Sequence, residues 1–184
     1  MDDKARLLKK SSADLPDLTL KDFRVVKQIG HGSFGRVFLA VNNLTREHVA
    51  IKNIRKDRIA KEPKAIKSVI IEFQLLFNAD HPNLCGMHYF FESDERLYFV
   101  MEFLEGGDIG HLVKAMKHIP ENAVKYWAVQ MLLGLNYLHD EDILHRDMKP
   151  DNLMITNEGD LKIIDFGLAR VLHEGSKANT RCGT

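Results

Sequence analysis

Apolar and polar residues alternate along much of the first hundred residues, and this alternation predicts a strand-rich region. Three strands are expected at 23–29, 36–41 and 48–53, and two more at 87–92 and 97–103. Short turns join the first three strands, so we expect them to pair in the antiparallel sense.

Between the third and fourth strands, apolar residues recur at helical spacing. The stripe consists of Ile66, Val69, Ile70, Phe73, Leu76 and Phe77. It predicts an amphipathic helix over 63–78, with Pro63 in its first turn. Glu72 lies at the edge of this stripe.

After about residue 104 the pattern changes to helix. Asp108 is suited to cap a short helix that ends near residue 117, and a long helix is expected over 121–139. Short apolar segments at 152–155 and 161–164 flank a turn-forming tetrapeptide and predict a hairpin.

The long helix is apolar on two nearly opposite faces. One face holds Val124, Trp127, Ala128, Met131, Leu135 and Leu138, and the other holds Tyr126, Val129, Leu133 and Tyr137. A helix of this kind requires packing partners on both sides. The hairpin supplies one partner, and we expect the second face to need further chain. Exposing it would cost about 1.5–3 kcal/mol for each large side chain, so the chain alone is expected to be marginally stable.

Composition is typical of a globular domain: 184 residues, 45% hydrophobic and 28% charged, with 26 basic and 26 acidic residues. No apolar run is long enough for a membrane span, and Cys85 and Cys182 suggest no disulfide framework. We therefore expect the cytoplasm, or the nucleus. The basic stretch 52–67 fits a nucleic-acid patch only weakly, and a solvated loop and outer helix face explain it better.

A glycine-rich motif, Gly30-x-Gly32-x-x-Gly35-x-Val37, follows the first strand. Glycines let backbone amides approach phosphate oxygens closely. By itself the motif also fits a dinucleotide-binding fold or a simple hairpin. A strand rather than a helix follows it, which disfavours the dinucleotide fold, and the Gly-Lys-Ser/Thr of a Walker loop is absent.

Lys52 lies on the strand that follows the glycine motif, within Val49-Ala50-Ile51-Lys52. Glu72, twenty positions later, could reach Lys52 from the predicted helix and hold its ammonium group beside phosphates. Taken alone, a lysine of this kind is far more commonly an exposed surface charge, and Glu72 alone would be read as a solvated charge on the helix.

The most informative run is 145–152, His-Arg-Asp-Met-Lys-Pro-Asp-Asn, followed by Asp-Phe-Gly at 165–167. Phosphoryl transfer needs an acceptor for the hydroxyl proton and oxygen ligands for magnesium. Asp147 suits the first role, and Asn152 and Asp165 suit the second. Lys149 could neutralise the transferred phosphoryl group.

With these motifs in this order, the sequence resembles the protein kinase family over 23–184. The resemblance implies an α+β, two-lobed fold. Its divisions are a flexible leader (1–22), a complete β-rich small lobe with the hinge (23–104) and the first part of a helical large lobe (105–184), ending inside the activation segment.

The resemblance also extends to a branch of the family. A lysine at position 149, after His-Arg-Asp, resembles serine/threonine kinases rather than tyrosine kinases. The segments GHGSFGRVFLA, LEGGD, NEGDLKIIDFGLAR and TRCGT resemble the AGC group, with features of its microtubule-associated and NDR-like kinases.

The resemblance also implies roles for individual residues. ATP contacts are expected from Ile29, Gly30, His31, Gly32, Ser33, Phe34, Gly35, Val37, Ala50, Lys52, Glu102, Leu104, Asp108 and Met154. Asp108 would contact the ribose and could attract substrate arginines. A spine linking the lobes would contain Leu76, Met87, His145 and Phe166. Thr180 matches an activation-loop phosphorylation site, and its phosphate would meet Arg146.

Two functions are therefore considered. The first is an ATP- and Mg²⁺-dependent serine/threonine protein kinase, with Lys52, Glu72, Asp147 and Lys149 as catalytic residues and Asn152 and Asp165 as metal ligands. Its substrate would be a protein, with basic residues near the target hydroxyl. The second is a catalytically inert fragment that binds Mg-ATP or a partner. A nucleic-acid or structural module has only the basic stretch in its favour.

Overall fold

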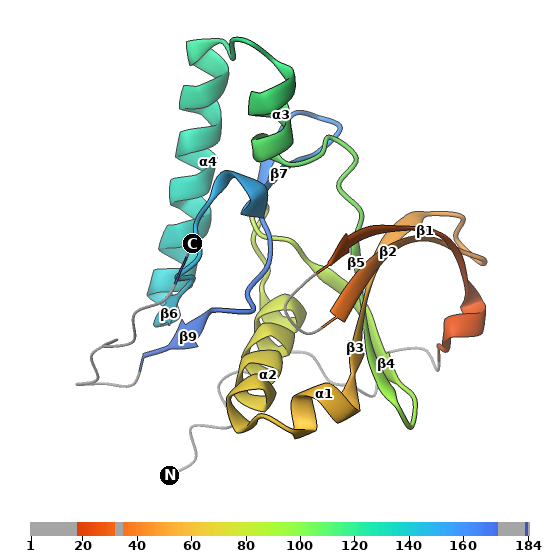
Figure 1. Ribbon diagram of the computed structural model, residues 1–184. Helices are drawn as coiled ribbons and strands as arrows, with labels where there is room; N and C mark the ends of the chain where they lie inside the picture. Colours follow the sequence, from red (N-terminus) through yellow and green to blue (C-terminus); the bar gives the residue numbers. More distant parts are fainter. Residues whose placement is uncertain (1–17, 32–34, 173–182, 184) are drawn as a thin grey trace. The chain divides into compact units, whose positions relative to one another are not determined.

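The computed structural model describes residues 18–31, 35–172 and 183, and its elements are shown in Figure 1. Contacts divide the chain into two compact units. Unit 1 comprises residues 1–78 and 86–103, and unit 2 comprises residues 79–85 and 104–184. The chain passes from unit 1 to unit 2 between Phe103 and Leu104, whereas the sequence placed the division after residue 104. The segment 79–85 packs with unit 2 although it lies between two elements of unit 1.

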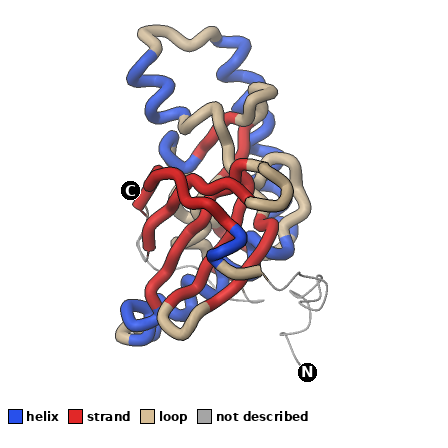
Figure 2. Tube along the Cα trace, turned by 90° about the vertical axis from the view of Figure 1, so that its right-hand side faces the viewer, coloured by secondary structure: helices blue, strands red, loops and turns tan. Residues whose placement is uncertain are grey.

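Unit 1 contains a five-stranded antiparallel sheet and two helices (Figures 1 and 2). Its elements are η2 (Leu20–Asp22), β1 (Phe23–His31), β2 (Gly35–Asn42), β3 (His48–Arg55), α1 (Lys56–Ala60), α2 (Pro63–Asn78), β4 (Met87–Glu92) and β5 (Arg96–Glu102). The strand order is β1-β2-β3-β5-β4, and neighbouring strands pair in the antiparallel sense. The predicted strands and the α2 helix are confirmed.

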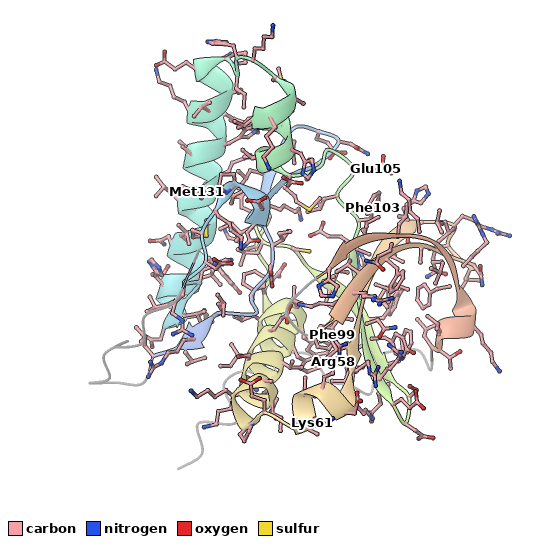
Figure 3. All side chains as sticks on the ribbon, in the orientation of Figure 1. Arg58, Lys61, Phe99, Phe103, Glu105 and Met131 are labelled. Carbon is pink, nitrogen blue, oxygen red and sulfur yellow. The ribbon has the colours of Figure 1, made fainter. Side chains whose placement is uncertain are left out.

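The two faces of the sheet have different partners because side chains alternate along each strand. Phe23, Ala40, Val49, Ile51, Tyr98 and Val100 form a core on one face, and Leu18 packs against it. On the other face Phe99 lies opposite Lys52 in the β3–β5 register. Phe73 of α2 packs there edge-on against Phe90 and at a tilt against Phe99 (labelled in Figure 3), with ring centroids 4.8 and 5.8 Å apart.

Two local expectations need adjustment in unit 1. The basic stretch 52–67 was expected to be a loop followed by a helix, but it also contains the short helix α1. Arg58 on α1 and Lys61 just after it are both exposed (Figure 3). Residues 20–22, assigned to the leader, form the 3-10 helix η2 with a capping box between Thr19 and Asp22. Residues 1–17 of the predicted leader lie outside the described residues.

Unit 2 is built from two helices and short strands (Figure 1). Its elements are α3 (Ile109–Ala115), α4 (Glu121–Asp140), β6 (Ile143–Leu144), η3 (Pro150–Asn152), β7 (Leu153–Ile155), β8 (Leu161–Ile163) and β9 (Arg170–Val171). Strands β7 and β8 form the predicted hairpin, and β6 pairs with β9. The segment 79–85 is fixed to β8 because Asn83 and Cys85 exchange backbone hydrogen bonds with Ile163.

Helix α4 holds the turn of the β7–β8 hairpin through polar side chains. Trp127 Nε1 donates to the Gly159 carbonyl, and Gln130 bonds both the Asp160 carboxylate and the Leu161 N–H.

Most of helix α4 is exposed or half-buried, and only its residues Gly134 and Leu138 are buried. The apolar residues of α4 that stay exposed are Val124, Tyr126, Val129, Leu132 and Leu133, at 48–60%. Val124 therefore does not join the packed face as predicted. On the second face Tyr126, Val129 and Leu133 are exposed in the part of the chain described, whereas Tyr137 packs against His81.

Among the described residues, none of the helices combines the length and the apolar composition required to cross a bilayer.

Candidate active site

The glycine motif lies between β1 and β2. A Cβ added at Gly35 would come within 2.0 Å of the Asn53 carbonyl oxygen, so β2–β3 pairing itself requires glycine there. A Cβ at Gly30 would only reach ordinary contact with Val37. Gly35 therefore has a structural reason to be glycine that is independent of any phosphate. The predicted residues Gly32, Ser33 and Phe34 lie outside the described residues.

Lys52 and Glu72 form a buried ion pair in unit 1. Lys52 Nζ contacts Glu72 Oε1, and the two side chains are only 7% and 2% exposed. The pair forms because Lys52 points to the α2 face of β3 while Glu72 lies on the inner face of α2. The two residues are therefore brought together as the sequence suggests, and neither is a surface charge.

Other predicted ATP-binding residues are distributed over both units. In unit 1, Ala50 is buried, Val37 and Glu102 are half-buried, and Ile29 and His31 are exposed. The Glu102 carboxylate accepts the Gly86 N–H at 2.7 Å and fastens the end of β5 to the start of β4. In unit 2, Leu104 is buried and Met154 is half-buried.

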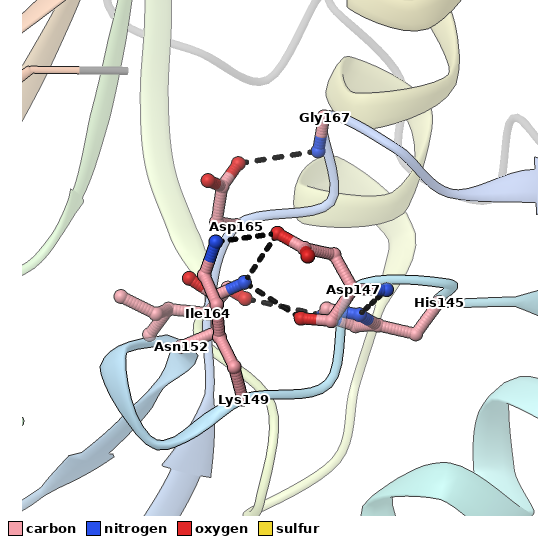
Figure 4. A network of polar contacts seen from close by, with 7 residues as sticks. All are labelled: His145, Asp147, Lys149, Asn152, Ile164, Asp165 and Gly167. Carbon is pink, nitrogen blue, oxygen red and sulfur yellow. Dashed lines mark hydrogen bonds and ion pairs between the residues drawn. The ribbon is translucent and has the colours of Figure 1, made fainter. Parts of the chain in front are cut away.

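The catalytic candidates of unit 2 lie in the loop between β6 and β7 (Figure 4). The Asp147 carboxylate lies between two partners: Lys149 Nζ at 2.9 Å and Asn152 Nδ2 at 3.1 Å. Asn152 is buried and its Nδ2 also donates to the Asp147 carbonyl at 2.8 Å. The hydrogen bond from Lys149 to Asp147 raises the pKa of Lys149, which keeps the ammonium charged. The loop thus presents a fixed carboxylate beside a fixed cation.

His145 supports this loop through both nitrogens of its ring. Its Nδ1 accepts the Asp147 N–H at 3.3 Å, and its Nε2 faces the Ile164 carbonyl at 3.2 Å. This arrangement requires the neutral ring with hydrogen on Nε2, because a protonated Nδ1 would oppose the Asp147 N–H. Burial lowers the pKa of His145 accordingly. Its ring packs edge-on against the buried Phe166, so these two predicted spine residues do touch. Leu76 and Met87, the other two, are buried in unit 1.

Asp165 adopts a left-handed backbone with φ 59°, and its Oδ1 accepts the Gly167 N–H at 3.2 Å (Figure 4). Such a conformation is rare for residues with a side chain and is kept only when surrounding structure enforces it. Here the neighbouring Ile164 donates its N–H to the Asn152 carbonyl. That bond ties the segment of Asp165 to the loop of Asp147.

Arg146 is also left-handed, with φ 67°, and its Nε donates to the Leu168 carbonyl at 2.8 Å. A Cβ at Gly183 would lie 3.0 Å from the Arg146 carbonyl oxygen, which places Gly183 beside this loop. Thr180, the predicted phosphorylation site, lies outside the described residues.

Asp108 is the N-cap of α3, as predicted. Its Oδ1 accepts the His111 N–H at 2.7 Å. Its Oδ2 lies 2.7 Å from Nδ1 of His111. His111 was not among the residues expected from the sequence, although a histidine three residues after a capping aspartate is a visible signal. Asn83 was not expected either, and its buried Nδ2 donates to the Leu161 carbonyl.

The described residues include the kinds of charged groups and oxygen atoms that bind the phosphates of a nucleotide and its magnesium ion. Lys52 supplies a buried ammonium held by a carboxylate, as a phosphate contact requires. Asn152 uses its Nδ2 on Asp147, which leaves Oδ1 as the atom for a cation. Together with the Asp165 carboxylate this gives the oxygen ligands that Mg²⁺ prefers.

Comparison with known proteins gives a consistent result. The family described as "Protein kinase domain" matches residues 23–184. The chain is 40% identical over 172 residues to "Probable serine/threonine protein kinase IREH1" of Arabidopsis thaliana, covering 92% of this chain and 13% of that protein. It is 38% identical over 160 residues to "Sperm motility kinase 2B" of Mus musculus, covering 87% and 32%. It is 38% identical over 168 residues to "Serine/threonine-protein kinase sgk-1" of Caenorhabditis elegans, covering 90% and 36%. The chain thus spans about a third or less of the length of these relatives.

Proposed function

Because the chain belongs to the protein kinase family, we propose that it transfers the γ-phosphate of ATP to serine and threonine hydroxyls of proteins. The names of two relatives, which describe serine/threonine kinases, support the choice of hydroxyl. The observation on which the proposal mainly rests is the Asp147 carboxylate, fixed between Lys149 and Asn152.

In unit 2 the proposed chemistry is acid–base. Asp147 accepts the proton of the substrate hydroxyl, since a carboxylate within hydrogen-bond reach is suited to that role. Asn152 and His145 hold the loop so that this carboxylate keeps one orientation. Lys149 is charged and stands beside it, where it neutralises negative charge on the phosphoryl group.

In unit 1 the proposed task is binding. Lys52 would contact ATP phosphates while Glu72 keeps its ammonium in place. The β1–β2 glycine motif, with Ile29, Gly30, His31, Gly32, Ser33, Phe34 and Gly35, would lie against the phosphates. Val37, Ala50, Glu102, Leu104 and Met154 would contact the adenine base.

Magnesium would be held by Asn152 and Asp165, and when bound it supplies charge neutralisation for the phosphates. The left-handed Asp165 and its bond to Gly167 orient the carboxylate for this purpose.

A preference for basic residues near the target hydroxyl is also proposed. A Cβ at Gly110 would lie 3.1 Å from Asp108 Oδ1 and 3.2 Å from Asp151 Oδ1. The two carboxylates therefore converge on one small space at the start of α3. Substrate arginines would be attracted to this negative charge. Comparing transfer to peptides with arginine or alanine before the serine tests the preference.

Regulation and classification extend the proposal. Phosphate on Thr180 would add about −1.5 to −2 charges and pair with Arg146, ordering the activation segment.

The subfamily is also part of the proposal. The motifs around the glycine loop, the Glu105-Gly106-Gly107-Asp108 run and the Asp-Phe-Gly segment favour an AGC-like branch related to microtubule-associated and NDR-like kinases. The cytoplasm or nucleus is the proposed location.

The decisive experiment uses the 184-residue chain with Mg-ATP labelled at the γ-phosphate and a basic serine peptide. We expect Asp147→Asn to reduce transfer by about 10²–10⁴-fold because the proton acceptor is lost. Asp94→Asn, an exposed aspartate in the β4–β5 turn, is the matched control and should leave transfer unchanged.

Binding should behave differently from transfer. Asp147→Asn should still bind Mg-ATP, because Lys52, Asn152 and Asp165 remain. If the wild-type chain binds Mg-ATP but transfers nothing, it is instead an inert nucleotide- or partner-binding fragment, and the enzymatic proposal is wrong.

A further inference from the structure

The side chain of His111 touches Asp108 and belongs to no role described above. His111 Nδ1 lies 2.7 Å from Asp108 Oδ2, while the His111 backbone N–H takes Oδ1. Both oxygens of the proposed ribose acceptor are therefore engaged by one residue. Because a carboxylate only accepts hydrogen bonds when ionised, Nδ1 of His111 must carry a hydrogen in this contact.

The two bonds differ in kind. The backbone bond is the helix cap, and it holds Asp108 whatever side chain stands at position 111. The ring contact is additional and depends on the imidazole. Removing the ring should therefore leave Asp108 in place but free one of its oxygens.

The pair is reachable from solvent on the histidine side. The His111 side chain is 82% exposed, whereas that of Asp108 is 23% exposed. Burial alone raises the pKa of Asp108, but the hydrogen bonds from His111 outweigh it and lower the pKa below the usual value. The carboxylate therefore stays ionised over the range in which histidines titrate.

Few other charges act on this pair. Helix α3 packs against η3 and β7. From η3, Asp151 approaches the same space at Gly110, and α3 itself carries Lys114 in its last turn. Strand β7 (Leu153–Ile155) contributes no titratable side chain. Lys149, which precedes η3, is paired with Asp147.

We propose that His111 is a positioning residue that sets how strongly Asp108 accepts a ribose hydroxyl of ATP. The His111 ring donates to Asp108 Oδ2 and so competes with a ribose hydroxyl for that oxygen. A fixed positive charge at position 111 would neutralise the carboxylate and weaken its acceptance further, because hydrogen bonds to charged groups exceed those to neutralised ones. The inference rests on the proposed nucleotide binding and adds a specificity determinant to it.

The test compares the affinities of the whole chain for Mg-ATP and for its 2′-deoxy and 3′-deoxy analogues. Only the ratio of ATP to a deoxy analogue is used, because the phosphates contribute alike to the binding of all three nucleotides. We expect one analogue to bind the wild-type chain about twofold more weakly than ATP.

Three variants identify the cause. His111→Ala frees Asp108 Oδ2 and should raise the ratio to about fivefold, and His111→Arg, with a permanent charge, should keep it at about twofold or lower. Asp108→Asn should reduce the ratio to about one. His118→Ala removes an exposed histidine after α3 and should behave as the wild type.

The possible failures are separable. A ratio that is the same in His111→Ala as in the wild type overturns the role of His111 while nucleotide binding stands. A ratio near one for both analogues in the wild type overturns it too, because Asp108 then makes no ribose contact. If neither ATP nor the analogues bind to any form, both this inference and the proposed function are wrong.

Discussion

The two units each hold a lysine against a carboxylate, but they position the pair by different means. In unit 1, Lys52 and Glu72 come from a strand and a helix, and their side chains are 7% and 2% exposed. In unit 2, Lys149 and Asp147 come from one loop and are 29% and 9% exposed. The first pair depends on regular secondary structure and burial. The second depends on a hydrogen bond that Asn152 donates to Asp147, on one that Asp147 donates to His145, and on the left-handed Arg146 nearby.

This difference shows why the two sites should tolerate change differently. A buried ion pair is costly to break because the remaining charge stays in an apolar environment. A loop site loses its geometry when one supporting hydrogen bond is removed, even while its ion pair is still formed. The contrast can be tested by substitution, from the largest expected effect to the smallest.

Breaking the buried pair should have the largest effect on stability. Lys52→Met leaves the Glu72 carboxylate buried without its cation, and should lower the free energy of unfolding by about 3–5 kcal/mol. Urea denaturation followed by circular dichroism measures this loss. The double variant Lys52→Met with Glu72→Leu should recover most of it.

The exposed pair Lys125–Glu121 on α4 is the control, with side chains 74% and 82% exposed. Lys125→Ala should cost less than about 1 kcal/mol. If Lys52→Met proves no more costly than Lys125→Ala, burial does not distinguish the pair of unit 1.

Removing the support of the catalytic loop should have the next largest effect. Asn152→Ala abolishes both bonds to Asp147 and should lower the unfolding free energy by about 1–3 kcal/mol. The single tryptophan, Trp127, lies in unit 2 and reports this loss by fluorescence. Asn157→Ala, which removes an exposed bond to Glu105, should change stability by only about 0.5 kcal/mol. Equal losses in the two variants would contradict a special role for the buried amide.

The loop of unit 2 should also be sensitive to acid. The pKa of His145 is lowered in the folded state, so the unfolded chain binds more protons between that value and about 6.5. Its contribution to stability is therefore complete above about pH 6.5 and declines as the pH falls below it, by at most about 1.4 kcal/mol per pH unit.

His145→Gln removes the titrating ring and should reduce this slope in denaturation experiments between about pH 7 and 5. Some slope should remain, because burial also lowers the pKa of His81. His118→Gln is the exposed control, and a slope unchanged in His145→Gln would exclude His145 as its source.

Substitution on the open face of α4 should have the smallest effect on stability. Leu132 is 60% exposed, so Leu132→Lys should change the unfolding free energy by only about 0.5 kcal/mol. It should also raise the concentration at which the chain aggregates, because an exposed apolar patch is reduced. Light scattering measures the aggregation.

Leu138→Ala provides the opposite control, because Leu138 is fully buried and its loss should cost about 2–5 kcal/mol. Unchanged aggregation in Leu132→Lys would show that this face does not drive association.

Much of the local structure followed from the sequence alone. Helix α2 begins and ends where the apolar stripe predicts, and β4 has the predicted bounds. Asp108 caps α3 as expected, because a capping bond involves only residues three positions apart. These features depend on neighbours in the chain, which is why a periodic pattern determines them. The order of the glycine, Lys52, His-Arg-Asp and Asp-Phe-Gly motifs along the chain is likewise sufficient to indicate the family.

Tertiary structure decided how the charges are paired and which faces are covered. The sequence left Lys52 and Glu72 as either a pair or two surface charges, and only packing of α2 against the sheet selects the pair. The sequence pattern placed residues 79–85 with the strand-rich region. In the structure, hydrogen bonds between this segment and β8 assign the segment to unit 2. The sequence pattern also placed Val124 on the packed face of α4, where the structure leaves it 48% exposed. Each of these outcomes depends on contacts between residues distant in sequence, and spacing along one element carries no information about them.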